Sequence, residues 1–273
     1  MRGANRSMVI GGAVVLATAG AVTAAGWEDL YVGADIGASF VPRVRIRDVV
    51  VSDGSGGGKT LTATQTETPV GGITFGSQDV AVDLDAGVAL NLKLGMKLND
   101  FAAVEIEAGY ARNDFSGFES GVWTLPTGDA AITGGSGELT QFPVFVNAKF
   151  ELPLSKRAEG SALGDMKFNF GAGIGLVSVD GNLSNIGIDD PALAGLTASV
   201  DGSSWEPGAQ FMAGIAWELA PNIDLGIGYR LMVVSGANLG KATFSDPAFV
   251  GLADVETGSI TSHAVQATLS FEF

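Results

Sequence analysis

Residues 79–96 carry the clearest pattern in this chain, a strict alternation of apolar side chains at even positions and polar or small ones at odd positions. A period of two is typical of a β-strand with one apolar face. The segment is longer than the about 5–6 residues of an ordinary globular strand, whereas a tilted strand crosses a bilayer with about 9–11 residues. The pattern therefore predicts one uninterrupted membrane-spanning strand whose even positions face lipid.

Seven other segments repeat this alternation, and strands are expected at residues 27–40, 102–113, 138–152, 166–177, 204–219, 223–232 and 260–273. The connections between the strands alternate between long and short. The long ones are expected at 41–77, 114–137, 178–203 and after 232, and the short ones at 97–100, 153–165 and 220–222. Short turns at one end and long loops at the other are typical of outer-membrane barrels, and a sheet in lipid must close to pair all its backbone groups. The predicted fold class is all-β, an eight-stranded antiparallel up-and-down transmembrane β-barrel with long external loops over residues 25–273.

Aromatic side chains fall at both ends of the predicted lipid-facing rows. One set is Phe40, Tyr110, Phe142 and Trp205, and the other is Phe150, Phe168, Trp217, Phe271 and Phe273. Two such belts mark the two interfaces of a membrane barrel. A soluble β-sandwich also alternates, but its strands are usually shorter and do not require aromatic residues at both ends.

The first 24 residues read as a secretory signal peptide. Arg2 and Arg6 precede an apolar stretch at 8–20, and small residues follow at 22–25. The alternative is a retained anchor, although the apolar part is short for a membrane span. The expected location is the outer membrane of a Gram-negative-type bacterium, with both termini in the periplasm.

Composition narrows the chemistry further. The chain has 273 residues, a net charge of −15, no cysteine and one histidine. The excess of acid argues against nucleic acid as a partner, and the absence of cysteine excludes disulfides and thiolate metal sites. No cofactor is expected.

Inward-facing positions of the predicted strands collect charged residues, which are Lys93, Glu105, Glu107, Lys149, Glu151, Lys167, Glu218, Asp224, Arg230 and Glu272. The interior of an eight-stranded barrel is just filled by side chains, so these charges must pair or hydrogen-bond. Lys93 and Glu105 are expected as near neighbours across the 97–100 turn. Two interpretations are open, an ion network that plugs the barrel and a water-filled conducting path, and we favour the ion network. If the path did conduct, its excess of acidic residues would favour cations.

A second charged set is expected at the barrel mouth. Arg43, Arg45 and Arg47 continue the inward parity of the first strand, and Asp79, Asp83 and Asp85 are expected beside them. The arginines could bind phosphate groups of lipopolysaccharide or another anionic ligand. We favour a paired hairpin extension, because the facing carboxylates neutralise the arginines.

Three near-motifs carry no chemistry. GSGGGKT at 54–60 has Asp53 where a phosphate-binding loop begins with glycine, and it joins no strand to a helix. The segment from Asp180 resembles the start of a calcium loop but has Asn185 and Pro191 at the positions of the required glycine and glutamate. His263 has the lipid-facing parity, so it gives no lumenal base and no enzyme is expected.

Five short stretches resemble the opacity-type, OmpA-like family of eight-stranded outer-membrane barrels. They are LYVG at 30–33, PVFVN at 143–147, FGAGIG at 170–175, GYR at 228–230 and LSFEF at 269–273. The resemblance covers about residues 30–273. It implies that Leu269, Phe271 and Phe273 form the signal read by the barrel-assembly machinery. Family members are variously adhesins, surface antigens, envelope anchors or small pores, and the chain ends at the last strand with no expected wall-binding domain.

The expected function is a structural or surface-interaction role, adhesin- or antigen-like, exercised through the external loops. The expected partners are outer-membrane lipid and lipopolysaccharide, the barrel-assembly machinery and an extracellular ligand of the loops. The alternative function is a small porin-like or gated pore with weak cation preference.

Overall fold

The computed structural model describes residues 26, 29–47, 51–52, 74–75, 80–120, 122–125, 128–155, 165–189, 194–247, 250–251 and 254–273. The expected signal peptide, Asp79 and the 54–60 near-motif lie outside these residues. Within the described part the chain is almost entirely β-strand, and no helix there is long and apolar enough to cross a membrane.

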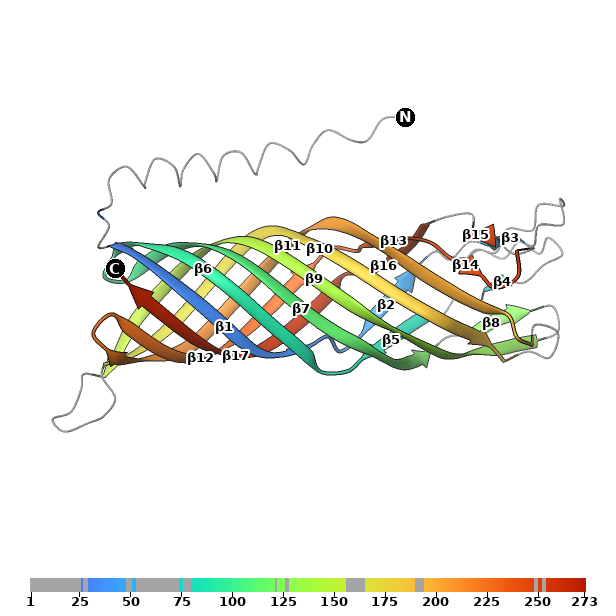
Figure 1. The fold of residues 1–273 in the computed structure, drawn as a ribbon, viewed down its shortest axis with the longest axis horizontal. Helices are drawn as coiled ribbons and strands as arrows, with labels where there is room; N and C mark the ends of the chain where they lie inside the picture. Colours follow the sequence, from blue (N-terminus) through green and yellow to red (C-terminus); the bar gives the residue numbers. More distant parts are fainter. Residues whose placement is uncertain are drawn as a thin grey trace, which may run out of the picture.

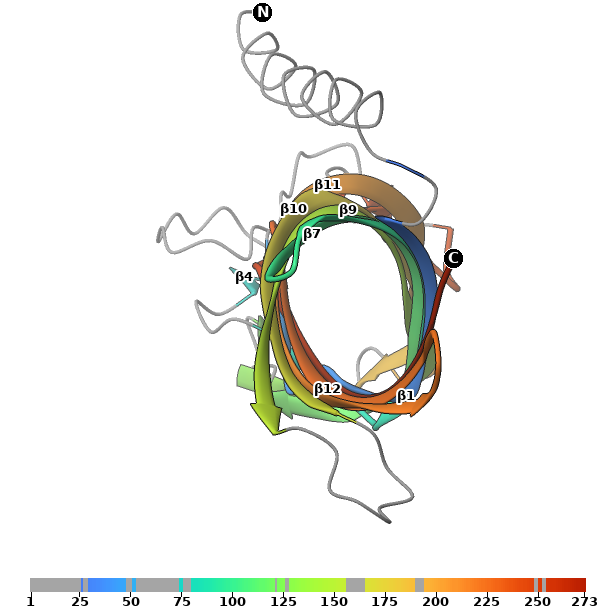
Figure 2. The same ribbon diagram turned by 90° about the vertical axis from the view of Figure 1, so that its left-hand side faces the viewer.

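Eight strands form a closed antiparallel ring. Its members, in order around the ring, are β1 (Leu30–Phe40), β6 (Gly87–Asn99), β7 (Ala102–Ser120), β9 (Gly128–Ser155), β10 (Met166–Ile188), β11 (Thr197–Ala220), β12 (Ile223–Val234) and β17 (Ile260–Glu272). Pairing of β1 with β17 closes the ring, which is seen end-on in Figure 2. The predicted eight-stranded up-and-down barrel is therefore confirmed.

The first and last strands begin and end at the same end of the barrel. The Phe273 amide donates to the Leu30 carbonyl at 3.1 Å, and the tight turns at 100–101 and 221–222 lie at this end as well. We call it the termini end and the opposite end the far end. In β1, Tyr31, Asp35 and Ser39 are buried inside the barrel, while Val32 and Ile36 are exposed outside it.

The barrel wall continues well beyond the predicted strands at the far end. β9, β10 and β11 run for 28, 23 and 24 residues, so the loops expected at 114–137 and 178–203 are mostly strand (Figure 1). Four shorter strands extend the wall at the far end, in the order β13-β16-β2-β5-β7. They are β2 (Val44–Arg47), β5 (Val80–Leu84), β13 (Asn238–Lys241) and β16 (Asp254–Thr257). The remaining short strands are β3 (Val51–Ser52), β4 (Thr74–Phe75), β8 (Val122–Leu125), β14 (Thr243–Phe244) and β15 (Val250–Gly251).

The loop prediction was wrong because the apolar side of the wall changes along each strand. Up to Leu176, the apolar side chains of β10 point outward. From Val177 onward the buried positions are Val177, Val179 and Leu183, and the outward ones are Ser178, Asp180 and Asn182. The strand keeps its parity while its apolar face moves from outside to inside, as expected where lipid gives way to water. The alternation of apolar outward positions therefore ends at Leu176, although the strand itself continues.

The expected single strand at 79–96 is two strands, separated at Asp85 and Ala86. In β6 the odd positions face the interior, as Ala89 and Asn91 do. In β5 the even residues Val82 and Leu84 pack on the interior instead. The break therefore reverses the parity, so the even positions of β5 are not lipid-facing as predicted.

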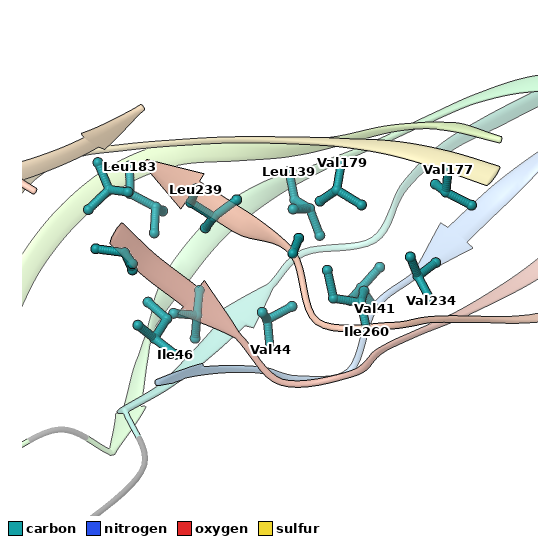
Figure 3. Packing of buried hydrophobic residues seen from close by; sticks show 14 of the residues in the cluster. Val41, Val44, Ile46, Leu139, Val177, Val179, Leu183, Val234, Leu239 and Ile260 are labelled. Carbon is teal, nitrogen blue, oxygen red and sulfur yellow. The ribbon is translucent and has the colours of Figure 1, made fainter. Parts of the chain in front are cut away.

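Aliphatic side chains fill the far half of the barrel (Figure 3). Four of these side chains have no exposed surface, namely Val177, Val179, Val234 and Ile260. Val44, Ile46, Val82, Leu239 and Val255 from the shorter strands belong to the same cluster. We call this set the apolar cluster. It is a hydrophobic core of the kind that stabilises a soluble protein.

Candidate functional site

Arg230 on β12 is the centre of the polar interior. Its guanidinium donates to Asn91 Oδ1 at 2.8 Å, to Asp35 Oδ2 at 3.0 Å and to Glu107 Oε2 at 2.9 Å. A second guanidinium nitrogen also contacts Glu107. Asp35, Glu107 and Arg230 are all buried. Four strands are thus tied across the lumen by one cation, through charge-assisted hydrogen bonds that are roughly twice as strong as neutral ones.

Lys93 pairs with Asp35 Oδ1 at 2.8 Å, and the Thr268 hydroxyl donates to the same oxygen over 2.8 Å. The predicted partner, Glu105, instead accepts a hydrogen bond from Tyr31 at 2.6 Å and lies 3.5 Å from Lys149. The difference follows from the register, since Lys93 lies opposite Glu107 rather than Glu105 on β7.

Nearer the termini end the charges form smaller groups. Lys149 bridges Glu105 and Glu151, the second at 2.9 Å. Lys167 pairs with Asp224 at 3.1 Å, and Lys97 pairs with Glu272 at 2.6 Å. Glu218 lies in the same rim, opposite Asp224 in the β11–β12 register. The structure thus brings most of the predicted lumenal charges into contact with an opposite charge.

Sequence reasoning missed the neutral part of this interior. Gln210 donates to Asn147 at 2.7 Å and to Glu107 at 3.3 Å, and Ser262 donates to Gln141 at 2.8 Å. These residues and Asp35 all lie at inward positions of their strands. The alternation that identified the charged lumenal residues therefore identifies them as well. Parity alone gives no hydrogen-bond partners, because these depend on the register between strands.

The polar half is not completely filled. A cavity of about 70 Å³ is lined by Tyr31, Glu105, Lys149, Arg230 and Gln266 among others. Buried polar atoms without a protein partner face the lumen, including Glu105 Oε2, Arg230 Nε and Gln266 Nε2. A polar space of this size holds a few water molecules. Among the described residues, no group of three or more His, Cys, Asp or Glu side chains is placed to hold a metal ion.

The predicted mouth arginines differ from expectation. Arg43 and Arg45 are exposed, whereas Val44 and Ile46 between and beyond them are buried in the apolar cluster. The chain leaves strand geometry at 41–43, which reverses the parity and turns the arginines to the outside of the wall. Asp83 and Asp85 lie on the neighbouring β5 and just after it. The side chain of Arg47, like Asp79, lies outside the described residues.

The three residues of the expected assembly signal, Leu269, Phe271 and Phe273, are all exposed on the outside of the last strand. His263 lies on the same outer surface near the other end of β17, where the Tyr229 hydroxyl and His263 Nδ1 are 2.5 Å apart. No lumenal base is therefore provided by the one histidine of the chain.

Aromatic contacts mark both edges of the apolar exterior. Tyr110 and Phe142 lie 5.1 Å apart toward the far end, and Phe150 and Phe170 stack at 5.2 Å toward the termini end. A closed ring with an exposed apolar belt between aromatic girdles defines the chain as a transmembrane β-barrel of the outer-membrane type.

Comparison with known proteins adds distant similarities. No family model matches the chain. An uncharacterized protein of Brucella suis biovar 1 (strain 1330) is 25% identical over 224 residues, 78% of this chain and 70% of the relative. A protein of Brucella abortus (strain 2308) gives the same identity and coverage.

Solved membrane proteins superpose weakly on the barrel. The outer membrane protease OmpT of Escherichia coli has a TM-score of 0.49 at 11% identity, covering 89% of this chain and 97% of its own. Outer membrane protein OprG of Pseudomonas aeruginosa has a TM-score of 0.44 at 11% identity, covering 90% and 97%. Neisserial surface protein A has a TM-score of 0.42 at 14% identity, also covering 90% and 97%. The names of these proteins describe different roles, so they assign no activity to this chain.

Proposed function

We propose that the protein is a closed structural and surface-interaction barrel of the outer membrane, which displays its far end to extracellular partners. In this orientation the termini end faces the periplasm, as the short turns there favour. The observation that carries the proposal is the closure of the lumen at two successive levels, by the Arg230 cluster and by the apolar cluster.

The two levels close the barrel by different physics. Around Arg230, two carboxylates and an amide bind both terminal nitrogens of the guanidinium across the lumen. Beyond it, Val177, Val234 and Ile260 are completely buried. Ions lose their hydration in an apolar layer at a cost of several kcal/mol. With the lumen closed, function belongs to the outer surface and the far rim.

A pore is the second candidate, and the cavity beside Glu105 supports it. That cavity and its unpartnered polar atoms indicate hydration of the half that faces the periplasm. Conduction would require water to continue past Arg230 and through the apolar cluster. Carboxylates lining such a path would give it cation preference.

Planar-bilayer recording of the refolded protein separates the two candidates. We expect no steady conductance for the natural sequence. As a positive control, Val177→Ser, Val234→Ser and Ile260→Ser combined with Arg230→Ala and Glu107→Ala should open both levels and conduct. Cation-selective current through the unmodified barrel would overturn the proposal in favour of the pore.

We also propose that the barrel has no catalytic role. The one histidine points toward lipid and is engaged by Tyr229, so no histidine faces the lumen to act as a general base. The proposed partners of the barrel are outer-membrane lipid and lipopolysaccharide, the barrel-assembly machinery and an extracellular ligand of the far rim. Nucleic acid has no role in this proposal. Loss of heat-modifiable migration in Phe273→Ser would support the assembly contact.

A further inference from the structure

The cavity of about 70 Å³ in the polar half has one wall without side chains. Gly214 on β11, and Gly226 and Gly228 on β12, lie at inward positions and form this wall. Glu105 lines the cavity from β7, which is four strands from β12 in both directions around the ring. The free space therefore lies between a buried carboxylate and a surface of backbone.

The cavity opens toward the termini end. Three carboxylates that line it become more exposed in that direction, since the side chains of Glu105, Glu151 and Glu272 are 1%, 16% and 28% exposed. Glu272 is the last residue of β17. A solute can thus reach the cavity from the termini end without crossing the Arg230 cluster or the apolar cluster.

Two hydrogen-bond acceptors in the cavity have no partner. Glu105 Oε1 accepts from Tyr31 and lies 3.5 Å from Lys149, whereas Glu105 Oε2 is buried without a partner. Asn169 Oδ1 is the second such acceptor. Glu105 and Asn169 each lie three residues into their strands from the termini end. A buried acceptor left unsatisfied is costly, so this part of the cavity calls for a ligand that donates.

Two donors without a partner lie deeper in the same cavity, Arg230 Nε and Gln266 Nε2. Arg230 is six residues further along β12 than the lining residue Asp224. Gln266 is likewise six residues further from the termini end than Glu272 on β17. The inner end therefore calls for a ligand group that accepts hydrogen bonds.

The charges differ between the two ends of the cavity. Around Arg230 two carboxylates pair with two cations, so the charges balance. Nearer the termini end, Lys149 is the one cation that pairs with Glu105 or Glu151 in the described part of the chain, which leaves one negative charge in excess. Such a charge attracts a cation much more strongly in a confined interior than in water. An ammonium ion also has three donors and no acceptor.

We propose that this cavity binds a small primary ammonium ion that carries a neutral oxygen group at its other end, as a short amino alcohol does. Its ammonium donates to Glu105 Oε2 and Asn169 Oδ1, and its oxygen accepts from Arg230 Nε and Gln266 Nε2. The volume corresponds to about five water molecules at about 10–15 Å³ each, so a ligand of about four or five non-hydrogen atoms fills it. Water alone would leave the negative charge in excess, and an inorganic cation would leave the two donors unsatisfied.

Three probes with equal numbers of non-hydrogen atoms test the site, namely ethanolamine, propylamine and ethylene glycol. At neutral pH the first has the ammonium and the oxygen, the second only the ammonium and the third only oxygens. Saturation-transfer NMR of the refolded barrel in detergent micelles, at constant ionic strength in potassium chloride, measures each affinity. We expect ethanolamine to bind best, propylamine several-fold more weakly, and ethylene glycol weakest of all. Equal affinities, no transfer to any probe, or displacement of ethanolamine by equimolar potassium would overturn the proposal.

Two variants locate the binding. Glu105→Gln should weaken ethanolamine at least about tenfold, because a charge-assisted hydrogen bond is lost. Its matched control is Glu218→Gln, an inward carboxylate outside the cavity lining, which should bind as the natural protein does. Gly228→Ala places a methyl group in the cavity, with its Cβ no closer than 3.3 Å to a neighbouring atom, and should weaken ethanolamine several-fold.

Unchanged affinity in both Glu105→Gln and Gly228→Ala, or an equal loss in Glu218→Gln, would overturn the site. Heat-modifiable migration verifies that every variant is folded. The binding requires neither a particular orientation in the membrane nor a closed lumen, so the conductance test is judged separately.

Discussion

The two halves of this barrel use the same strands to solve opposite packing problems. In the half near the termini, β10 and β12 present apolar side chains outward and Lys167, Asp224 and Arg230 inward. In the far half the same strands bury Val177, Val179 and Val234 inside. The medium outside decides which face is apolar, since lipid needs no polar exterior and water requires one.

The two halves should also respond differently to the loss of a side chain. The polar half holds its charges through a few directed contacts, so the removal of one partner leaves others buried and unpaired. The apolar cluster spreads its stabilisation over many small contacts, and a deletion there costs burial and a cavity. Substitutions of similar size should therefore have different signatures in the two halves.

The largest effect is expected at Arg230. Arg230→Leu leaves Asp35 and Glu107 buried without their shared cation, and the loss of a buried partner typically costs about 3–5 kcal/mol. Urea unfolding in detergent or lipid measures this loss. Adding Glu107→Gln should recover part of the stability. If the two changes simply add, the carboxylates are separately solvated and the Arg230 cluster does not close the lumen.

A somewhat smaller effect is expected in the apolar cluster. Ile260→Ala should lower the free energy of unfolding by about 3 kcal/mol, through lost burial and the cavity left behind. Val265→Ala, on the exposed lipid-facing side of the same strand, is the control and should cost much less. Equal losses at the two positions would mean that the far interior is not close-packed.

The boundary between the halves should be visible on the outside of β10. Leu176→Lys introduces a charge at the edge of the lipid-facing belt and should cost about 1–2 kcal/mol, between the interface and midplane values for outer-membrane barrels. Ser178→Lys, one outward position further on, should leave stability nearly unchanged. A larger loss at Ser178 than at Leu176 would move the membrane boundary toward the far end.

The smallest effect is expected at the rim. Lys97 and Glu272 are both about 30% exposed, at 30% and 28%, so removal of the pair should cost less than about 1 kcal/mol. The effect should shrink further in high salt because mobile ions screen partly exposed charges. A loss comparable to that of Arg230→Leu, and insensitive to salt, would contradict the distinction between rim and centre.

Sequence reasoning performed best where one apolar face met lipid. The alternation located all eight ring strands, and parity placed Arg230, Glu107 and Lys149 inside the barrel. It failed beyond the membrane, where the apolar face moves inward after Leu176 and at the parity reversals near 41–43 and 85–86. It also paired Lys93 with Glu105 instead of Asp35, since register between strands distant in sequence is not encoded in either strand alone.

Water access to single cysteines tests the central claim most directly, because the natural chain contains none. Val234→Cys lies in the apolar cluster, Thr268→Cys lines the polar cavity, and Ser178→Cys points outward above the membrane. With the folded barrel in lipid vesicles that admit a small charged thiol reagent to both sides, we predict labelling at Thr268→Cys and Ser178→Cys. Val234→Cys should react only after unfolding. Labelling of folded Val234→Cys at the rate of Ser178→Cys would contradict a dry far half and a lumen closed at two levels.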